Sequence, residues 1–348
     1  MALQQLPSVA TQYAALQRAE NGAAVSAALR LWKRMGNEFD ASFIQIAPQL
    51  IDVMNTAQLR ISQNAQAYIP EILDATGQSR ANKPRLTIPE NAFVGTAGNG
   101  LPTESLAYGT VTRAKTAVGK GMTPAQALAQ GGQFMALSLG TMLSDTRRGM
   151  EGFETYSRPI SGFIRQLSPP SCPRCVILAG KWYRKNAGFD RHPACDCIGI
   201  PAAENVAGDM LTDTNEYLNS LDDDGLTYAL GSKKNAEAFR DYGADPFQIA
   251  NAYRKTPVYG ADGVKRYVGG VEKAQQYGKN VKYTKEGMTK RGLAYKQMRN
   301  VRALSRGPTA YENGRRVIAR RLMPETIIGF KLSQERTASM LRDFGWLR

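Results

Sequence analysis

Apolar residues recur at intervals of three and four in the first part of the chain. Within residues 41–61 this spacing covers Phe43, Ile46, Ala47, Leu50, Met54, Ala57 and Ile61. The spacing puts all of them on one face, which predicts an amphipathic helix packed on a core. Pro48 lies inside the run, so we expect a kink or a division there. With an earlier helix over 23–35 that ends at Gly36, residues 1–76 are predicted to be N-terminal helices.

The middle of the chain alternates between irregular and helical patterns. Residues 77–103 are rich in Gly, Pro, Asn and Thr and show no period, which predicts a long linker or loop that reaches a neighbour. Thr123 and Pro124 are typical of an N-cap and a first helical position. We therefore expect a helix from there to about residue 149, inside a helical region over 104–165 that ends in a short strand at 163–167.

The pattern weakens toward the C-terminus. Residues 203–250 are predicted to be an acidic helical region, and 251–348 to be basic arms and helices. Asp222, Asp223 and Asp224 are interpreted as a solvated turn, because a calcium loop aligned on Gly225 would lack its final Glu. Helices are expected over 203–218, 232–242, 245–253, 315–321, from 324, and over 333–344, and extended arms over 259–295.

Candidate chemistry is concentrated in one short stretch. All four cysteines and the single histidine lie there, as Cys172, Cys175, His192, Cys195 and Cys197. Zn²⁺ is held by four nitrogen or sulfur ligands, and a C-x₂-C pair can direct two thiolates at one ion. The pair Cys172–Cys175 would provide two ligands. The other two would come from the later segment 192–197, as His192 with Cys197, His192 with Cys195, or Cys195 with Cys197. Five residues thus compete for four positions, and the sequence leaves the choice open.

Other uses of these thiols fit the sequence less well. Disulfides are typical of small secreted domains, whereas this chain has 348 residues and no visible signal peptide. A redox C-x-x-C pair usually follows a strand, and here Pro169 and Pro170 precede it. The His-x-Glu of zinc deaminases and the His-Glu-x-x-His of zincins are both missing. We predict a structural zinc in a module over 166–202, with strands over 176–178 and 180–183, as in a zinc ribbon or treble clef.

The charge of the chain is unevenly distributed. Its net charge is +15, and residues 251–348 hold 22 Lys and Arg against 7 Asp and Glu. Such a segment favours sequence-independent, salt-sensitive contact with nucleic acid, although it also suits an acidic protein surface. The residues singled out for nucleic-acid or partner contact are Lys181, Arg184, Lys185, Arg191, Arg315, Arg316, Arg320 and Arg321. No apolar run is long enough for a membrane span, so no membrane contact is expected.

Several of these motifs together resemble a known family. The run Gly162-Phe-Ile-Arg165, the Cys-Pro-Arg-Cys pair, Leu178-Ala-Gly and the ending Arg191-His-Pro-x-Cys-Asp-Cys197 are similar to phage Mu F-like (MuF-like) minor capsid proteins, closest to the branch from phages of actinobacteria. The His-Pro-x-Cys-x-Cys ending is the most specific part. The resemblance extends from about residue 110 to the C-terminus.

The resemblance implies a role and a place. It implies a mostly helical head morphogenesis protein without enzymatic activity, made in the bacterial host cytoplasm and housed in the virion, inside the head of a tailed phage near the portal. Its expected partners are the portal protein, the major capsid or scaffold protein, and packaged double-stranded DNA. The alternative is a zinc-containing nuclease or a toxin-fused enzyme such as an ADP-ribosyltransferase, for which the sequence offers no paired catalytic set. The predicted fold class is mainly α, with a small α+β zinc-knuckle module and extended arms.

Overall fold

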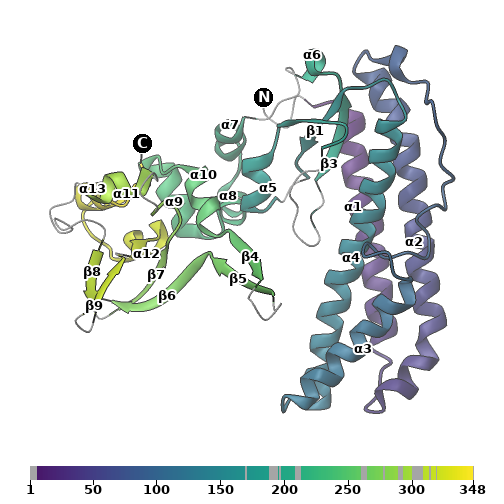
Figure 1. Ribbon diagram of the computed structural model, residues 1–348, viewed down its shortest axis with the longest axis horizontal. Helices are drawn as coiled ribbons and strands as arrows, with labels where there is room; N and C mark the ends of the chain where they lie inside the picture. The colour runs from purple at the N-terminus through teal and green to yellow at the C-terminus, as the bar shows by residue number, and fades with distance from the viewer. Residues whose placement is uncertain are drawn as a thin grey trace. The chain divides into compact units, whose positions relative to one another are not determined.

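The computed structural model describes residues 6–168, 171–187, 195, 197–207, 213–259, 265–276, 279–288, 293–299, 309–312, 315–318 and 320–347. The chain is mainly helical and forms two compact units. Unit 1 comprises Met1–Ser168 and Ala179–Asp213, and unit 2 comprises Pro169–Leu178 and Thr214–Arg348. Figure 1 labels their elements. The helical part of the predicted fold class is therefore confirmed.

Four long helices lie side by side in unit 1 (Figure 1). They are α1 (Ser8–Trp32), α2 (Phe39–Ala75), α3 (Thr103–Gly119) and α4 (Pro124–Tyr156). The apolar set predicted for residues 41–61 lies on α2, and all of its members except the half-buried Ala47 are buried in the core of the bundle. Burial of each large apolar side chain contributes roughly 1.5–3 kcal/mol. The amphipathic face read from the sequence is confirmed.

Helix α2 continues through both of its prolines, Pro48 and Pro70. The expectation that Pro48 might divide the helix is therefore wrong. A proline in a helix interior removes one backbone hydrogen bond and costs about 3 kcal/mol. Ile46 and Leu50, on either side of Pro48, are 1% and 0% exposed, so packing of the surrounding turns offsets that cost.

The start of α4 is as predicted. Thr123 Oγ1 accepts a hydrogen bond from the Gln126 N–H at 3.3 Å, and the Thr123 N–H donates to Gln126 Oε1 at 3.0 Å. This reciprocal pair satisfies two backbone donors that the helix leaves open. Further along α4, a Cβ on Gly131 would meet the Trp32 ring at 2.7 Å, so the glycine is needed for close packing.

The irregular stretch over 77–103 is fastened along unit 1 rather than extended from it. It contains the short 3₁₀ helix η2 (Ser79–Ala81). Gln58 on α2 donates to Thr96 O at 2.8 Å and accepts from the Gly95 N–H at 2.9 Å. Gln66 donates to Ile88 O at 2.8 Å. These two side chains satisfy backbone groups of the loop that no regular element pairs.

A three-stranded antiparallel sheet adjoins the bundle within unit 1. Its central strand is β1 (Gly162–Gln166), with β2 (Trp182–Arg184) and β3 (Ile198–Ala202) at its edges. The strand expected at 163–167 is confirmed. The strand expected at 176–178 is wrong, because those residues belong to helix α5 (Pro173–Leu178). Proline at a first helical position favours that outcome. Short helix α6 (Glu204–Ala207) follows the sheet.

A buried polar network joins the helices to this sheet. Tyr13 on α1 donates to Glu151 Oε1 at 2.8 Å and stacks on Tyr68 of α2 with ring centroids 3.9 Å apart. Tyr68 donates to Gly199 O at 3.2 Å, and the Gly199 N–H donates to Glu151 Oε2 at 3.4 Å. Arg147 Nε lies 3.6 Å from Glu151 Oε1. Loss of solvation on burial raises the pKa of Glu151, although the Arg147 charge opposes that shift.

Glu151 should therefore make stability depend on pH. With a folded-state pKa above its ordinary 4.5, the carboxyl stabilises the fold fully below that value and loses the contribution as pH rises through its folded pKa. In Glu151→Gln that dependence is removed. We expect the unfolding free energy of the wild type, minus that of the variant, to fall as the pH is raised from 4.5 toward neutral, by at most about 1.4 kcal/mol per pH unit. Urea unfolding across that range measures it, and a flat difference would contradict the prediction.

Unit 2 combines short helices with small antiparallel sheets. Besides α5, its helices are α7 (Thr214–Asn219), α8 (Asp223–Leu230), α9 (Lys233–Tyr242), α10 (Pro246–Ala252), α11 (Leu293–Arg299), α12 (Pro324–Gly329) and α13 (Gln334–Asp343). The strands are β4 (Lys255–Tyr259), β5 (Lys265–Gly269), β6 (Val271–Gln276), β7 (Lys279–Thr284), β8 (Thr309–Glu312), β9 (Arg315–Ile318) and β10 (Arg321–Leu322). β4 pairs with β5, β8 with β9, and β7 with both β6 and β10.

Helix starts in unit 2 follow the sequence closely. Ser232, Asp245 and Ser333 cap α9, α10 and α13 with their side chains, and Pro324 opens α12, as expected. Asp222 caps α8, with Oδ1 accepting from the Gly225 N–H at 2.8 Å. The acidic run is thus the start of a helix.

Two expectations for unit 2 are wrong. The described residues within 259–295 are not arms or loops apart from a packed core, because Val281, Met288 and Ala294 are 1%, 7% and 0% exposed. The helix expected over 315–321 is replaced by β9 and by Arg321 of β10. β-branched Val317 and Ile318 favour a strand, and β9 pairs with β8 along its whole length.

Candidate metal centre

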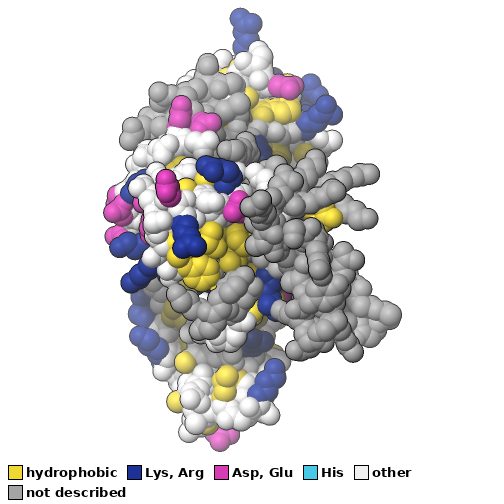
Figure 2. Space-filling view, turned by 90° about the vertical axis from the view of Figure 1, so that its left-hand side faces the viewer, with side chains coloured by type: hydrophobic (Ala, Val, Ile, Leu, Met, Phe, Trp, Pro, Cys, Tyr) yellow, Lys and Arg dark blue, Asp and Glu magenta, His cyan; other side chains and the backbone are white. Residues whose placement is uncertain are grey.

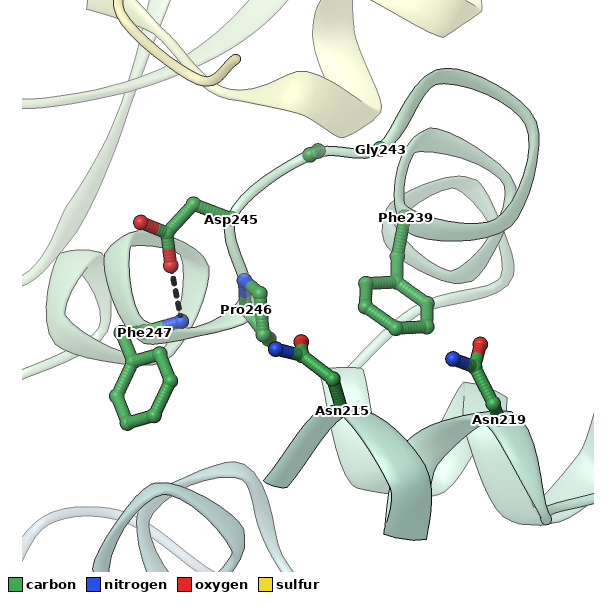
Figure 3. Close-up of a pocket in the computed structure, with 8 residues that line it drawn as sticks. Asn215, Asn219, Phe239, Gly243, Asp245, Pro246 and Phe247 are labelled. Atoms are coloured by element: carbon green, nitrogen blue, oxygen red, sulfur yellow. Dashed lines mark hydrogen bonds between the residues drawn. The ribbon is translucent and has the colours of Figure 1, made fainter. Parts of the chain in front are cut away.

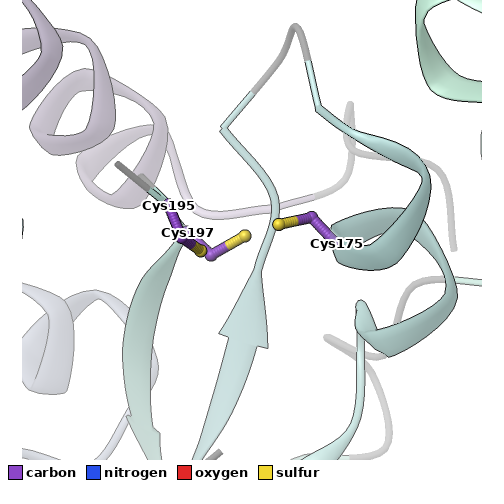
Figure 4. Close-up of side chains that lie close together, drawn as sticks. All are labelled: Cys175, Cys195 and Cys197. Carbon is purple, nitrogen blue, oxygen red and sulfur yellow. The ribbon is translucent and has the colours of Figure 1, made fainter. Parts of the chain in front are cut away.

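Three of the five candidate ligands come together. Cys175 of α5 and Cys195 and Cys197, which precede β3, direct their side chains toward one another (Figure 4). Their sulfur atoms all lie within 4.8 Å of one another, and the three residues are 2%, 1% and 0% exposed. None of the four cysteines forms a disulfide.

The donor set fits a thiophilic metal ion. In a tetrahedral zinc site with Zn–S distances of about 2.3 Å, sulfur atoms are separated by roughly 3.8 Å. Sulfur atoms already within 4.8 Å need only small rotations to reach that geometry. Thiolates favour zinc and other soft metals over calcium or magnesium. The three buried thiols are thus close enough to bind a metal ion.

The other two candidate ligands, Cys172 and His192, are not part of this group of three thiols. Cys172 is half-buried and is not one of the three residues whose sulfur atoms all lie within 4.8 Å of one another. Cys172 immediately precedes α5, and its carbonyl accepts the Val176 N–H at 3.1 Å as the helix begins. The second cysteine of the C-x₂-C pair therefore lies on the first turn of a helix. His192 lies outside the described residues.

Arginines contact the segment that holds Cys195 and Cys197. Arg147 Nη2 donates to Cys197 O at 2.6 Å, and Arg148 donates to Cys195 O. Arg165 Nη2 lies 3.7 Å from Cys195 Sγ, in hydrogen-bonding geometry, and the residue is 1% exposed. Metal sites with three or four thiolates carry negative charge, and donors in the outer shell orient such ligands. Arg147 and Arg148 therefore position the backbone of Cys197 and Cys195, and Arg165 would offset negative charge on Cys195 if a metal ion were bound.

Sequence reasoning missed this role of the arginines. Arg147 and Arg148 are close to the end of the helix predicted to stop near residue 149, where cations suit the helix dipole. Arg165 offered one usable signal: it is a charged residue in the middle of an otherwise buried strand, and buried charges need partners.

The eight cations predicted to contact nucleic acid or a partner are described only in part, and they belong to both units. Lys181 and Arg184 are exposed, and Lys185 Nζ lies 5.2 Å from the Tyr156 ring centroid. Arg320 lies 5.2 Å from the Tyr283 ring centroid. Of the remainder, Arg191 is outside the described residues, and Arg315 and Arg316 are described only as part of the β9 backbone.

The assignment of Arg321 to a contact surface is corrected. Arg321 is 1% exposed, and its guanidinium lies 3.6 Å from the Trp346 ring centroid. It donates to Phe344 O, Glu286 O, Gln248 Oε1 and Gly345 O at 2.8, 3.1, 2.5 and 2.7 Å. Burial lowers the pKa of Arg321 to about 9, against the opposing charges of Glu286 and Asp245. It therefore stays charged at neutral pH and holds the core of unit 2 together.

A hollow of about 310 Å³ in unit 2 offers little reactive chemistry (Figure 3). Its polar lining includes the amides of Asn215 and Asn219 and the carboxylate of Asp245. That carboxylate accepts the Phe247 N–H at 2.9 Å as the cap of α10. The rings of Phe239 and Phe247 supply apolar surface. This lining contains no pairing of a nucleophile with a base.

Comparison with known proteins identifies no relative. No protein-family model, curated protein or solved structure matches the chain. Across the residues that the structure describes, none of the helices combines the length and the apolar character needed to cross a membrane.

Proposed function

We propose that the chain is a structural minor capsid protein of a tailed phage that acts in head assembly and carries one structural zinc. The buried thiol cluster is the observation that supports this most directly. Cys175, Cys195 and Cys197 belong to the motifs on which the resemblance to MuF-like proteins rests, and they converge although up to 22 positions separate them in sequence. His192 and Cys172 are the candidates for the fourth ligand.

The proposed role of zinc is to stabilise the fold. A bound ion would hold the thiolates together and add its binding free energy to folding. The thiols are at most 2% exposed, which suits a closed structural site better than an open catalytic one. Arg165 would orient Cys195, and Arg147 would hold the backbone of Cys197.

We further propose that the basic C-terminal region contacts packaged double-stranded DNA, and that other surfaces contact the portal and the capsid or scaffold. The support is the charge of residues 251–348, which hold 22 Lys and Arg against 7 Asp and Glu. Figure 2 shows Lys and Arg side chains beside an apolar patch, with acidic side chains among them. Mixed surfaces of this kind suit protein contacts as well as phosphates.

Purified phage heads test the proposal. We expect the chain to be present in heads and protected from added protease until the heads are opened. The purified chain should contain about one zinc, the content of a single four-ligand site. Absence of the chain from heads would overturn the assignment. Cleavage of plasmid DNA with Mg²⁺ or Mn²⁺, lost on chelation, would favour an enzyme instead.

A further inference from the structure

Unit 2 contains a cavity whose walls carry an excess of positive charge. The cavity holds about 430 Å³, within the range common for small-ligand sites. Three elements line it: the start of α9, strand β7, and helix α12 with its end. Its charged lining consists of Lys233, Lys234, Lys282 and Glu325.

The single carboxylate in the lining is already engaged. Glu325 Oε2 accepts from Lys282 Nζ at 2.8 Å, and Glu325 Oε1 accepts from the Tyr253 hydroxyl at 2.8 Å. The Glu325 side chain is 9% exposed, whereas that of Lys282 is 42% exposed. The buried Glu325 thus holds the Lys282 ammonium in place, and Lys282 remains accessible from the cavity.

The remaining two lysines have no such partner. Within the described part of the chain, neither Lys233 nor Lys234 is paired with a carboxylate. Both lie in the first turn of α9, which contains no acidic residue. The helix dipole disfavours cations there by about 0.3–1 kcal/mol each. Such a local conflict is characteristic of binding sites, where a ligand resolves it.

The Lys234 ammonium lies beside Gly329 at the cavity wall. A Cβ on Gly329 would lie 2.7 Å from Lys234 Nζ, so the absence of a side chain at residue 329 leaves room for the ammonium. Thr326 supports the opposite wall, because its hydroxyl accepts the Lys282 N–H at 2.9 Å and donates to Lys282 O at 3.1 Å. Three lysines therefore line the cavity, and the hydrogen bonds of Thr326 hold two of its walls, β7 and α12, together.

We propose that this cavity binds a phosphate group through Lys233, Lys234 and Lys282. Three ammonium donors and one neutralised carboxylate leave a net positive site, and phosphate accepts several charge-assisted hydrogen bonds at once. The phosphate belongs either to the DNA backbone, in which case the site rests on the proposed function and gives it named residues, or to a small phosphorylated molecule.

Binding of pyrophosphate and of a short DNA duplex to the full chain tests the site. In Lys233→Gln/Lys234→Gln, we expect pyrophosphate affinity to fall at least about 10-fold, since each hydrogen bond to a charged group is worth roughly 1.5–3 kcal/mol. Gln preserves helix propensity. The matched control Lys83→Gln/Lys120→Gln removes the same charge from exposed positions in unit 1 and should bind as the wild type does.

A second variant separates geometry from net charge. Gly329→Ala leaves the charge unchanged but displaces the Lys234 ammonium, so pyrophosphate binding should weaken at least about 3-fold, as expected when a charge-assisted contact is disturbed but not removed. Circular dichroism of each variant confirms that the fold is retained.

The duplex identifies the source of the phosphate. If the phosphate belongs to DNA, pyrophosphate competes with the duplex. The magnitude of the slope of log duplex affinity against log salt is then smaller by about 2 in Lys233→Gln/Lys234→Gln than in the wild type. If it is a small molecule, only pyrophosphate binding changes beyond the control. The proposed phosphate site is overturned if pyrophosphate does not bind to the wild type. It is also overturned if pyrophosphate binds equally well to Lys233→Gln/Lys234→Gln and to the control variant. Presence of the chain in phage heads is unaffected by that outcome, so the two proposals fail separately.

Discussion

Cys197→Ser is expected to lower the zinc content of the purified chain from about one ion to a tenth or less. Cys197 is 0% exposed and belongs to the converged thiol group. A serine hydroxyl remains protonated at neutral pH and is a poor ligand for zinc. Loss of a direct ligand should exceed the 10–100-fold effect of an outer-shell change, so affinity should fall at least about 100-fold, or roughly 2.8 kcal/mol. Elemental analysis and thermal unfolding with and without chelator measure both effects.

Cys172→Ser distinguishes the two candidates for the fourth ligand. Cys172 is half-buried and lies outside the group. A chain that keeps its zinc in Cys172→Ser but loses it in Cys197→Ser leaves His192 as the fourth ligand. Zinc retained at full occupancy in Cys197→Ser would contradict the candidate site.

Arg321→Ala is expected to destabilise unit 2 by about 3–5 kcal/mol. The substitution leaves three backbone carbonyls, one of them fully buried, and Gln248 Oε1 without their donor and opens a cavity beside Trp346. Each unsatisfied buried group costs about 1–3 kcal/mol. Lys in its place supplies one charge point and cannot reach four acceptors, so Arg321→Lys should recover little of the loss. Urea unfolding followed by far-UV circular dichroism measures the change.

The neighbouring arginine is a control with the same change in charge. Arg320 is half-buried, lies over the ring of Tyr283 and is close enough to Glu272 to help lower the pKa of that carboxyl. Arg320→Ala should therefore destabilise by about 1 kcal/mol or less. Equal losses in the two variants would show that the charge, and not the buried hydrogen-bond set of Arg321, stabilises the unit.

Helices with local signals could be predicted from the sequence. The stripe on α2 and the caps at Thr123, Ser232 and Asp245 each depend on a few neighbouring residues. Their energies are decided locally, and pattern reasoning captures them. Pro48 shows the limit, because the packing that tolerates it comes from α1, α3 and α4, which its own sequence window does not contain.

Strands and buried charges in unit 2 were not predictable in the same way. β7 pairs with β10, whose residues lie 37 or more positions further along the chain, and such pairings leave little trace in either segment. The arginine run before Met323 resembles a basic surface helix. Only the tertiary structure reveals that Arg321 is enclosed by acceptors from three separate segments.

The candidate metal centre was partly predictable. Clustering of every cysteine with the single histidine indicated a metal site and the residues that compete for it. It did not reveal that Cys175 lies on a helix that begins directly after Cys172, because spacing does not show whether the C-x₂-C gap forms a turn or begins a helix. The arginine partners of Cys195 and Cys197 come from α4 and β1, so spacing alone could not identify them.

Helices α1 and α4 contact each other through specific side chains at three positions along their length. Trp32 occupies the notch at Gly131, Asn21 donates to Gly140 O at 3.1 Å, and Tyr13 reaches Glu151. A slide by one turn, about 5.4 Å, would push a side chain into the indole and break the other two links at once. We therefore expect α1 and α4 to resist sliding past each other and to move together as one rigid element.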